Sequence, residues 1–343
     1  MNILITSIGQ RGYLIDHFRE VVNGKHGIFA ADALRYAPAL KNADKAFVIP
    51  YASDERYCEM LVNLCKENDI CAVFSINDLE LPFLAKYKPV LAQHGINAVI
   101  CDEPIIELCT DKYLTYQFCK RHNVNAPRTY LWTEKDELLR DIRNGLLSYP
   151  IVAKPRRGSR SIGIHMLRDE AELLRDIEAE ANSAKPENEK CMYQEQLQGT
   201  LIGAHVLCNR RQEPVSIVTM RNITKHLGET FQNRSFHDNE LFEYVYHAVA
   251  SVGAYGIIDL NIMQKENGEF ALLEFNPRLS GGYSLSHFSH PRFTKTLLRI
   301  ALGEDVEQDM DSIYEFKDII MLKQFTTTWT TEEDIDSSIR VYT

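Results

Sequence analysis

Short apolar runs alternate with amphipathic stretches over roughly the first hundred residues. The runs have the length of buried strands and lie at 2–6, 27–31, 46–49, 72–75 and 98–100. Stretches between them, such as 57–68, repeat their apolar positions with a helical period. Because alternating strands and helices are typical of a doubly wound sheet, the pattern predicts a parallel α/β domain.

The turns that follow the predicted strands carry polar side chains. Ligands of an open parallel sheet bind beyond the carboxyl ends of its strands. The residues at these ends are Arg11, Asp32, Asn77 and Asp78. The alternative for each is a helix cap or a solvated turn, and an N-cap suits Asn77 or Asp78 as well as a substrate contact. The turn at 9–12 does not match the Gly-x-Gly-x-x-Gly spacing, which argues against NAD or FAD binding.

A basic, glycine-containing loop follows a strand in the middle of the chain. The strand at 149–155 contains Lys154, and residues 156–164 follow as Arg-Arg-Gly-Ser-Arg-Ser-Ile-Gly-Ile. Backbone amides and hydroxyls of such a loop can cradle phosphate oxygens while Lys154 neutralises their charge. The loop lacks the Gly-Lys-Ser/Thr of a Walker A sequence, and a basic surface hairpin is the alternative.

Polar side chains share one face of two strands in the C-terminal half. A strand at 256–263 and the apolar run after it flank a hairpin turn at 266–269. In the second strand, Glu274, Asn276 and Arg278 project to the same side of an extended chain. The oxygens of the first two suit Mg²⁺, and Arg278 is placed to stabilise charge on a transferring phosphoryl group. The alternative is a buried strand that runs into a Pro-Gly turn.

The first strand of this hairpin offers further oxygen ligands. Asp259 and Asn261 alternate onto one face, and Asn261 lies 13 positions before Glu274. Both can therefore lie beside Glu274 across the hairpin and add oxygen ligands for Mg²⁺. The sequence leaves open which of the two binds the metal.

The remaining predicted segments contain fewer candidate functional residues. Helices are expected at 113–123, from 168 onwards and at 240–252, and a strand is expected at 215–221. The polar segment 222–238 is too long for a tight turn and is interpreted as a loop on the acceptor side of a site. His287 and His290, spaced i, i+3, form either a metal pair or part of a solvated or substrate-facing loop.

Composition and net charge narrow the classes to which the protein can belong. The 343 residues carry a net charge of −10, which argues against nucleic acid or an anionic membrane as the main partner. No apolar stretch reaches about 18 residues and no signal peptide is recognisable, so a cytoplasmic protein is expected. The eight cysteines form no Cys-x-x-Cys pair, which indicates reduced thiols and argues against a zinc site.

The run Glu-Phe-Asn-Pro-Arg-Leu-Ser-Gly-Gly at 274–282 closely resembles the metal-binding strand end of ATP-grasp enzymes. The likeness is to the branch related to the carbamoyl-phosphate synthase large subunit and biotin carboxylase. It implies an α/β and α+β architecture, in which a Rossmann-like domain precedes the ATP-grasp fold. The implied parts are a Rossmann-like pre-ATP-grasp domain at 1–105, a lid subdomain with the phosphate loop at 106–190, a large subdomain with the adenine hinge and metal site at 191–305, and a tail at 306–343.

The resemblance also implies roles for individual residues. The residues matched to ATP binding are Lys112, Lys154, Ser159, Ser161, Gly163, Glu195, Gln196 and Leu197. The implied metal ligands are Glu274, Asn276, Asn261 and Asp259, and the implied catalytic residues are Arg278 and Arg221. The expected substrate contacts are Arg11, Asn77, Asp78, Ser280 and Tyr283. Two positions depart from the family pattern: Thr200, where an acidic residue usually binds ribose, and the neutral Asn261.

The function implied by this resemblance is ATP-dependent ligation of a carboxylate to an amine. An acylphosphate would form first, and ADP and phosphate would be released. The expected cofactors are ATP and Mg²⁺, with Mn²⁺ as a substitute, and the partners are small-molecule carboxylates and amines. A homodimer is expected from the family alone. The alternatives are a bicarbonate-phosphorylating enzyme like carbamoyl-phosphate synthase and a non-catalytic ATP-binding regulator.

Overall fold

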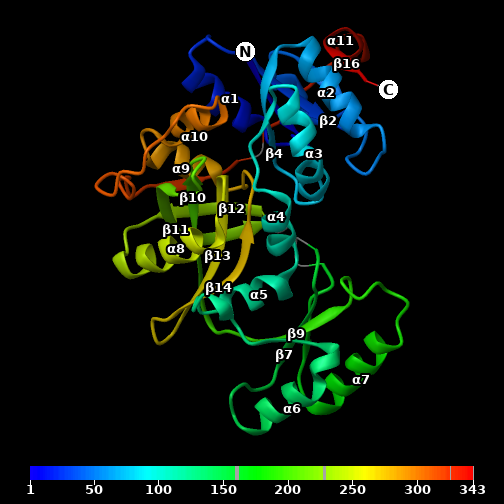
Figure 1. Cartoon of the computed structure of the whole chain (residues 1–343), viewed down its shortest axis with the longest axis vertical. Coiled ribbons are helices and arrows are strands. Elements are labelled where there is room, and N and C mark those ends of the chain that lie inside the picture. Colours follow the sequence, from blue (N-terminus) through cyan, green and yellow to red (C-terminus); the bar gives the residue numbers. More distant parts are fainter. Residues whose placement is uncertain (159–161, 227–228, 325, 343) are drawn as a thin grey trace. The chain divides into compact units, whose positions relative to one another are not determined.

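A six-stranded sheet incorporates the apolar runs of the N-terminal residues (Figure 1). The computed structural model describes residues 1–158, 162–226, 229–324 and 326–342. The strand order is β16-β3-β2-β1-β4-β5, and every neighbouring pair is parallel. The bounds are β1 Asn2–Thr6, β2 Ile28–Asp32, β3 Ala46–Val48, β4 Ile70–Ser75, β5 Asn97–Ala98 and β16 Ile339–Val341. The predicted parallel α/β domain is confirmed.

Helices between these strands bury one apolar face each. They are α1 Gly12–Val22, the 3-10 helix Pro38–Asn42, α2 Tyr57–Glu67 and α3 Leu81–Gln93. In α1, Leu14, Phe18 and Val22 are buried at helical spacing. They join Ile3 and Ile5 of β1 in one core, as expected for a parallel sheet whose strands are apolar on both faces.

A second six-stranded sheet has the order β14-β13-β10-β11-β12-β15. Its strands are β10 Gly199–Cys208, β11 Pro214–His226, β12 Glu229–Ser235, β13 Gly256–Lys265, β14 Phe270–Asn276 and β15 Ile320–Leu322. The helices of this part are α8 Asn239–Val252, α9 Tyr283–Ser289 and α10 Phe293–Ala301. β13 and β14 are neighbours, so the predicted hairpin with its turn at 266–269 is present.

Two segments that the sequence predicted as loops are regular structure. Much of 222–238 belongs to β11 and β12, which pair antiparallel, with Met220 opposite Ser235. The prediction was wrong because the segment is polar, although Asn233 and Ser235 alternate onto a buried face. The region around His287 was also expected to be a loop, whereas it forms the helix α9.

A third sheet has four antiparallel strands in the order β6-β9-β7-β8. Its bounds are β6 Thr129–Leu131, β7 Ile151–Pro155, β8 His165–Leu167 and β9 Cys191–Glu195. The helices of this region are α4 Glu103–Thr110, α5 Lys112–Arg121, the 3-10 helix Trp132–Glu134, α6 Lys135–Arg143 and α7 Glu170–Ala181. Leu138, Ile151 and Tyr193 belong to one buried cluster that joins α6 to β7 and β9.

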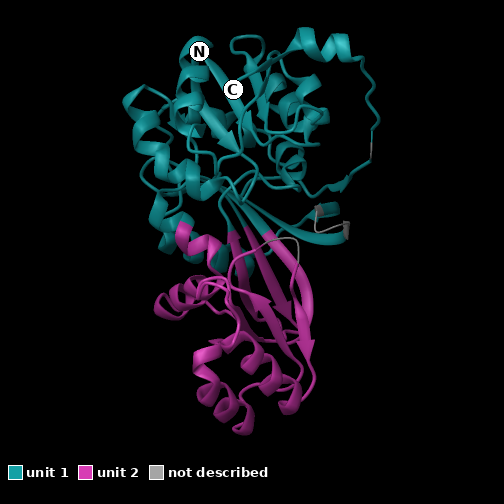
Figure 2. Ribbon diagram, turned by 90° about the vertical axis from the view of Figure 1, so that its right-hand side faces the viewer, with its two compact units in different colours: residues 1–106, 204–259, 276–343 teal, residues 107–203, 260–275 magenta. Residues whose placement is uncertain are grey.

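Packing divides the chain into two compact units, which Figure 2 colours separately. Unit 1 comprises residues 1–106, 204–259 and 276–343, and unit 2 comprises residues 107–203 and 260–275. Strands β10, β13 and β14 each contain residues of both units. The four parts predicted from the sequence, with boundaries near residues 105, 190 and 305, stay a prediction. Among the described residues, no helix combines the length and apolar character needed to cross a bilayer.

The C-terminal segment, red in Figure 1, contributes a short strand to each of two sheets. β16 pairs in parallel with β3, and β15 pairs antiparallel with β12. Between them lies α11 Glu332–Ser338, where Asp336 forms an ion pair with Arg35. Strands of three residues show too little periodicity to be predicted from the sequence.

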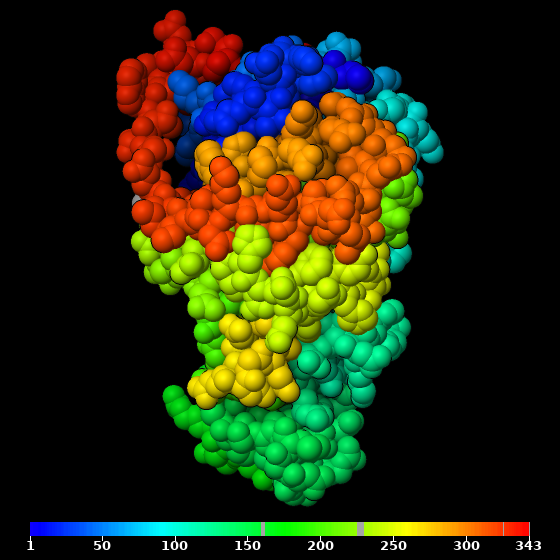
Figure 3. Space-filling view, turned by 90° about the vertical axis from the view of Figure 1, so that its left-hand side faces the viewer, coloured from blue at the N-terminus to red at the C-terminus, as the bar shows by residue number. Residues whose placement is uncertain are grey.

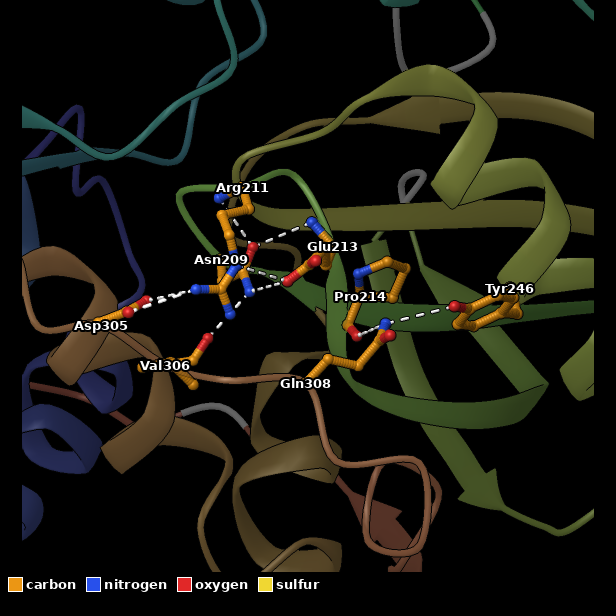
Figure 4. Close-up of polar contacts among 8 residues, drawn as sticks. All are labelled: Asn209, Arg211, Glu213, Pro214, Tyr246, Asp305, Val306 and Gln308. Carbon is orange, nitrogen blue, oxygen red and sulfur yellow. Dashed lines mark hydrogen bonds and ion pairs between the residues drawn. The ribbon is translucent and has the colours of Figure 1, made fainter.

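Residues after α10 are also tied to the turn between β10 and β11 (Figure 4). Nδ2 of Asn209 donates to the carbonyl of Val306 (2.9 Å), and Arg211 forms an ion pair with Asp305 (3.1 Å). Nε2 of Gln308 donates to the carbonyl of Pro214 (2.7 Å). The buried Asn209 amide fixes the turn more strongly than the exposed ion pair, because solvent screens the latter.

Candidate active site

Lys154 of β7 is a nearly buried cation in unit 2. Burial is the main cause that lowers the pKa of Lys154 from 10.5 to about 8, while Glu274 acts against this change and Lys112 adds to it. We call Lys112, Lys154, Asn261 and Glu274 the lysine–glutamate cluster. Because water stabilises the Lys154 ammonium so little, an additional anion such as a phosphate would interact with it strongly.

Lys112 stands at the start of α5, which is tied to the basic loop. Asp111 caps the helix by accepting hydrogen bonds from two N–H groups of its first turn, and its Oδ2 accepts from Nη2 of Arg156 (2.5 Å). Nζ of Lys112 donates to the carbonyl of Gly158 (2.7 Å). The N-terminus of α5 therefore lies beside the loop, and such a terminus favours nearby anions.

The structure describes the basic loop after β7 except for residues 159–161. Ser159 and Ser161 lie outside the described residues, so their predicted phosphate contacts stay predictions. Gly163 has a φ of +77°, and a Cβ there would lie 2.9 Å from Cγ of Pro155. Glycine is thus required where the loop turns back toward β8.

The segment predicted to contact adenine begins with Glu195, the last residue of β9. Oε2 of Glu195 accepts a hydrogen bond from the backbone N–H of Arg128 (3.1 Å). A carboxylate can accept several hydrogen bonds, so this contact orients Glu195 and leaves capacity for a further donor. Gln196 and Leu197 lie half-buried beyond the strand end.

A close backbone contact explains the glycine at the start of β10. Gly199 has a φ of +151°, and a Cβ there would lie only 2.1 Å from the carbonyl oxygen of Gln264 in β13. A real Cβ cannot approach a backbone oxygen so closely, and backbone yields less readily than a flexible side chain. Any larger residue would push these two strands apart.

Gly199→Ala is expected to lower the free energy of unfolding by at least about 2 kcal/mol, since it combines backbone strain with a steric clash. Urea unfolding would measure the change. Gly268→Ala is the matched control, because Gly268 also has a positive φ but open space around its missing Cβ. A loss in Gly199→Ala no larger than in Gly268→Ala would contradict the steric explanation.

Asn261 and Glu274 lie side by side across the β13–β14 hairpin. Nδ2 of Asn261 donates a hydrogen bond to Oε1 of Glu274. Carboxylate and amide oxygens are ligands that Mg²⁺ accepts, and turning over the Asn261 amide would present its oxygen on the same side as the carboxylate. The donor set of this pair therefore fits Mg²⁺, and Lys154 supplies a cation for phosphate oxygens.

Arg278 is held in unit 1 by a two-point ion pair. Its Nε donates to Oδ1 of Asp78 (2.7 Å), and its Nη2 donates to Oδ2 of Asp78 (3.0 Å). The same Nη2 lies 3.4 Å from Oδ1 of Asn276. We call Asp78, Asn276 and Arg278 the Arg278 clamp. Two parallel hydrogen bonds fix the plane of a guanidinium, which a single contact does not do.

A buried histidine that the sequence analysis missed lies next to the motif. Nε2 of His205 forms a hydrogen bond with Oγ of Ser280 (2.6 Å), and its Nδ1 forms one with Oγ of Ser286 (2.6 Å). Oδ1 of Asp259 lies 3.6 Å from Nε2. Burial and the charge of Arg278 lower the pKa of His205 to about 3, so the ring is neutral and positions Ser280. In the sequence, this residue could have been noticed as a single His within the apolar run that forms β10.

Tyr283 and Ser280 are less accessible than predicted for substrate contacts. Tyr283 is fully buried, packs against Phe18 and Phe293, and shares a hydrogen bond with Thr294 (2.9 Å). A substrate could reach this hydroxyl only by displacing core residues, so its placement speaks against the predicted contact. Ser280 is also buried.

The other predicted residues have local contacts. Nη1 of Arg11 lies 3.4 Å from the carbonyl of Ile76, and Oδ1 of Asn77 accepts from the N–H of Leu79 (3.1 Å). Asn77 therefore stabilises a turn before α3. The guanidinium of the exposed Arg221 lies 5.2 Å from the ring centroid of Phe236. The predicted substrate and catalytic roles of these residues stay predictions.

Comparison with protein families decides the relationship. Residues 3–100 match the PylC-like, N-terminal domain, and residues 109–282 match the ATP-grasp domain, which is just over half of the chain. The chain belongs to the ATP-grasp family. The resemblance to ATP-grasp enzymes drawn from the motif at 274–282 is thereby confirmed, whereas the branch within the family stays a prediction. ATP-grasp enzymes bind ATP with Mg²⁺, and they are generally ADP-forming ligases.

Known proteins share parts of this ATP-grasp chain. Biotin carboxylase from Campylobacter jejuni has a TM-score of 0.74 at 17% identity, covering 93% of this chain and 74% of that chain. L-amino acid ligase from Bacillus licheniformis has a TM-score of 0.64 at 18% identity, covering 88% and 74%. At such identities the likeness shows the fold. The vancomycin/teicoplanin A-type resistance protein VanA of Enterococcus faecium is 29% identical over 115 residues, 34% of this chain and about a third (31%) of VanA.

Proposed function

We propose that this ATP-grasp protein is an ATP-dependent carboxylate–amine ligase. It would form an amide through an acylphosphate and release ADP and phosphate. The observation that carries the proposal is the lysine–glutamate cluster, in which a desolvated cation lies near paired oxygen ligands. The partial sequence match to VanA and the fold shared with an L-amino acid ligase support amino acids as the class of substrate.

The proposed reaction has two transfers. An oxygen of the substrate carboxylate attacks the γ-phosphorus, and the bond from that phosphorus to the bridging oxygen breaks, which releases ADP. The amine nitrogen then attacks the carbonyl carbon of the acylphosphate, loses a proton, and expels phosphate with the bonding electron pair. Both steps develop charge on phosphoryl or carbonyl oxygens, so preoriented cations account for most of the catalysis.

The side chains have distinct tasks in this scheme. Lys154 and Lys112 would neutralise the phosphate oxygens of bound ATP. Arg278, preoriented by Asp78, would stabilise the transferring phosphoryl group without having to reorient during the reaction. Arg221 is proposed as a second cation for the intermediate.

The residues proposed to hold Mg²⁺ are Glu274 and Asn276, with Asn261 as the further ligand. Bound Mg²⁺ would neutralise charge between the phosphates of ATP. The hydrogen bond between Asn261 and Glu274 favours Asn261 over Asp259, whose carboxylate lies near His205. Mn²⁺ has similar ligand preferences and is expected to substitute. A cytoplasmic location and a homodimer stay predictions.

The kcat/KM for ATP is expected to fall as the pH rises past about 8. Lys154, with a pKa of about 8, is cationic below that pH and neutral above it, and only the cation neutralises phosphate. The decrease approaches about tenfold per pH unit, since kcat/KM reports ionisation of the free enzyme. Lys154→Arg stays charged and should remove the decrease. A wild-type profile that stays level up to pH 10 would contradict this role of Lys154.

The experiment that tests the proposal is Mg²⁺-dependent ADP release with pools of amino acids, dipeptides, hydroxy acids and bicarbonate. ADP formed only when a carboxylate and an amine are both present would support the ligase. Release with bicarbonate alone would favour the carboxyphosphate alternative. ATP binding without turnover on any pool would favour a regulatory protein. AMP as the product would contradict the acylphosphate mechanism.

A further inference from the structure

A cluster of two histidines and one glutamate lies in unit 1, apart from every residue assigned to ATP or Mg²⁺. His17 and Glu20 belong to α1, and His287 belongs to α9. One ring nitrogen of each histidine and one carboxylate oxygen of Glu20 all lie within 4.8 Å of one another. Figure 3 shows the segments that contain α1 (blue) and α9 (orange) side by side on one face, in agreement with the contacts between these helices.

Hydrogen bonds orient these side chains. Nδ1 of His287 forms a hydrogen bond with Oγ1 of Thr294 (2.8 Å), and its Nε2 lies 3.1 Å from Oε2 of Glu20. Nε2 of His17 forms a hydrogen bond with Oγ of Ser284 (2.8 Å). Nδ1 of His17 is buried and lacks a hydrogen-bond partner among the described residues. Such a nitrogen is unusual in a folded protein and calls for an explanation.

The chemistry of the cluster suits a particular class of ion. Two imidazoles and one carboxylate are ligands of borderline transition metals, with Zn²⁺ as the main example, whereas Mg²⁺ prefers oxygen ligands alone. His17 is only 5% exposed, but the side chain of Glu20 is 62% exposed, so the carboxylate side is open to solvent. That side gives an ion a path of entry and room for water as a fourth ligand.

We propose that His17, Glu20 and His287 form a binding site for a divalent transition metal of the Zn²⁺ class. The proposal departs from the expectation that there is no zinc site, because that expectation was drawn from the cysteines alone and these ligands contain no thiolate. His290, which the sequence offered as the partner of His287, is not part of this three-ligand group, and its Nδ1 accepts from the N–H of Arg292 (3.1 Å). The partner of His287 comes instead from α1.

Metal binding requires a small rearrangement of the histidine rings. The rings of His17 and His287 are stacked with centroids 4.1 Å apart and planes 13° apart. Nitrogen lone pairs lie in the ring planes, and two stacked, nearly parallel planes do not meet near the rings, so one ring must rotate for both nitrogens to reach the same ion. The bound ion would fasten α9 to α1, and α9 begins directly after the 274–282 motif.

Zn²⁺ titration of the untagged, chelator-treated full chain by calorimetry tests this site. Saturating Mg²⁺ is present throughout so that Zn²⁺ does not occupy the oxygen ligands of the ATP site. The wild type is expected to bind one Zn²⁺ per chain and to melt at a higher temperature with Zn²⁺ than without it. Glu20→Gln and His287→Gln are each expected to weaken Zn²⁺ binding at least about tenfold.

The matched control is His237→Gln. His237 also lies beside a carboxylate, that of Asp318 (3.0 Å), but the pair is not part of any three-ligand group found among the described residues. The His237→Gln variant is expected to bind Zn²⁺ with the same affinity as the wild type. Glu20 is exposed, so Glu20→Gln decides the question even if His287→Gln does not fold. Absence of stoichiometric binding in the wild type, or equal affinity in Glu20→Gln, would overturn the proposal.

The result is independent of the proposed ligase function. Zn²⁺ binding is measured without turnover, and Glu274→Gln is expected to bind Zn²⁺ as the wild type does. A chain that releases ADP but binds no Zn²⁺ would therefore contradict only the metal site. A chain that binds Zn²⁺ without forming ADP would contradict only the ligase.

Discussion

Glu274→Gln is expected to reduce ADP formation at least about a thousandfold while the protein stays folded. Glutamine has nearly the same volume and can still accept the hydrogen bond from Asn261, so the hairpin should remain intact. The variant loses the negative charge that Mg²⁺ requires. It also loses the anion that raises the pKa of Lys154, so the decrease in kcat/KM for ATP should move to a lower pH.

Steady-state ADP release measures the loss of activity, and circular dichroism measures whether the variant stays folded. Glu269→Gln is the matched control, because Glu269 lies at the turn of the same hairpin, 55% exposed, where it pairs with Lys265 (3.3 Å). Its activity should stay within about twofold of the wild type, as for most surface changes. A Glu274→Gln variant that keeps more than a tenth of wild-type activity would show that Glu274 is not a metal ligand.

Arg278→Lys is expected to lower kcat about a hundredfold and to leave the KM for ATP nearly unchanged. Lysine keeps the positive charge but offers a single ammonium in place of the planar fork that contacts both oxygens of Asp78. The cation would then lose its orientation toward the transferring group. An interaction made mainly in the transition state appears in kcat, which is the reason for expecting this division.

Asp78→Asn tests the orientation of the Arg278 guanidinium while leaving the positive charge of Arg278 in place. Asparagine can accept only one of the two hydrogen bonds from Arg278, so we expect a loss smaller than that of Arg278→Lys. Arg211→Lys is the control, because Arg211 pairs with Asp305 (3.1 Å) at an exposed position. A higher KM for ATP with unchanged kcat in Arg278→Lys would instead mean that Arg278 binds substrate and transition state equally.

The elements that could be predicted from the sequence are those with strong local periodicity. β1 and β4 are apolar on both faces, and α1 has a buried stripe, so each is recognisable without its neighbours. The same holds for the hairpin of β13 and β14. Its period of two placed Glu274 on the face of Asn276, and the turn set the register that brings Glu274 beside Asn261.

Polar or very short elements could not be predicted. The strand predicted at 215–221 is the first half of β11, but the segment 222–238, which completes β11 and forms β12, carries few apolar residues and was interpreted as a loop. β16 has three residues and pairs with β3 from the opposite end of the chain. The pairing depends on the completed sheet, so no local pattern of Ile339–Val341 could indicate it.

Contacts between residues far apart in the sequence could not be predicted from local patterns, for the same reason. Arg278 and Asp78 are 200 positions apart, and each was singled out separately, one as catalytic and one as a substrate contact. His205 reaches Ser280 across 75 positions, and His287 reaches Glu20 across 267. Their chemistry is visible only when the fold brings them together, whereas neighbours such as Glu274 and Asn276 could be grouped from spacing.

Transfer of oxygen-18 tests the central claim most directly. The carboxylate substrate found by ADP release would be labelled with oxygen-18 in its carboxyl group, and the phosphate released during amide formation would be analysed by mass spectrometry. An acylphosphate intermediate predicts one labelled oxygen in each phosphate, because the oxygen that attacks the γ-phosphorus leaves with it. Unlabelled phosphate from a reaction that still forms the amide would contradict the proposed mechanism.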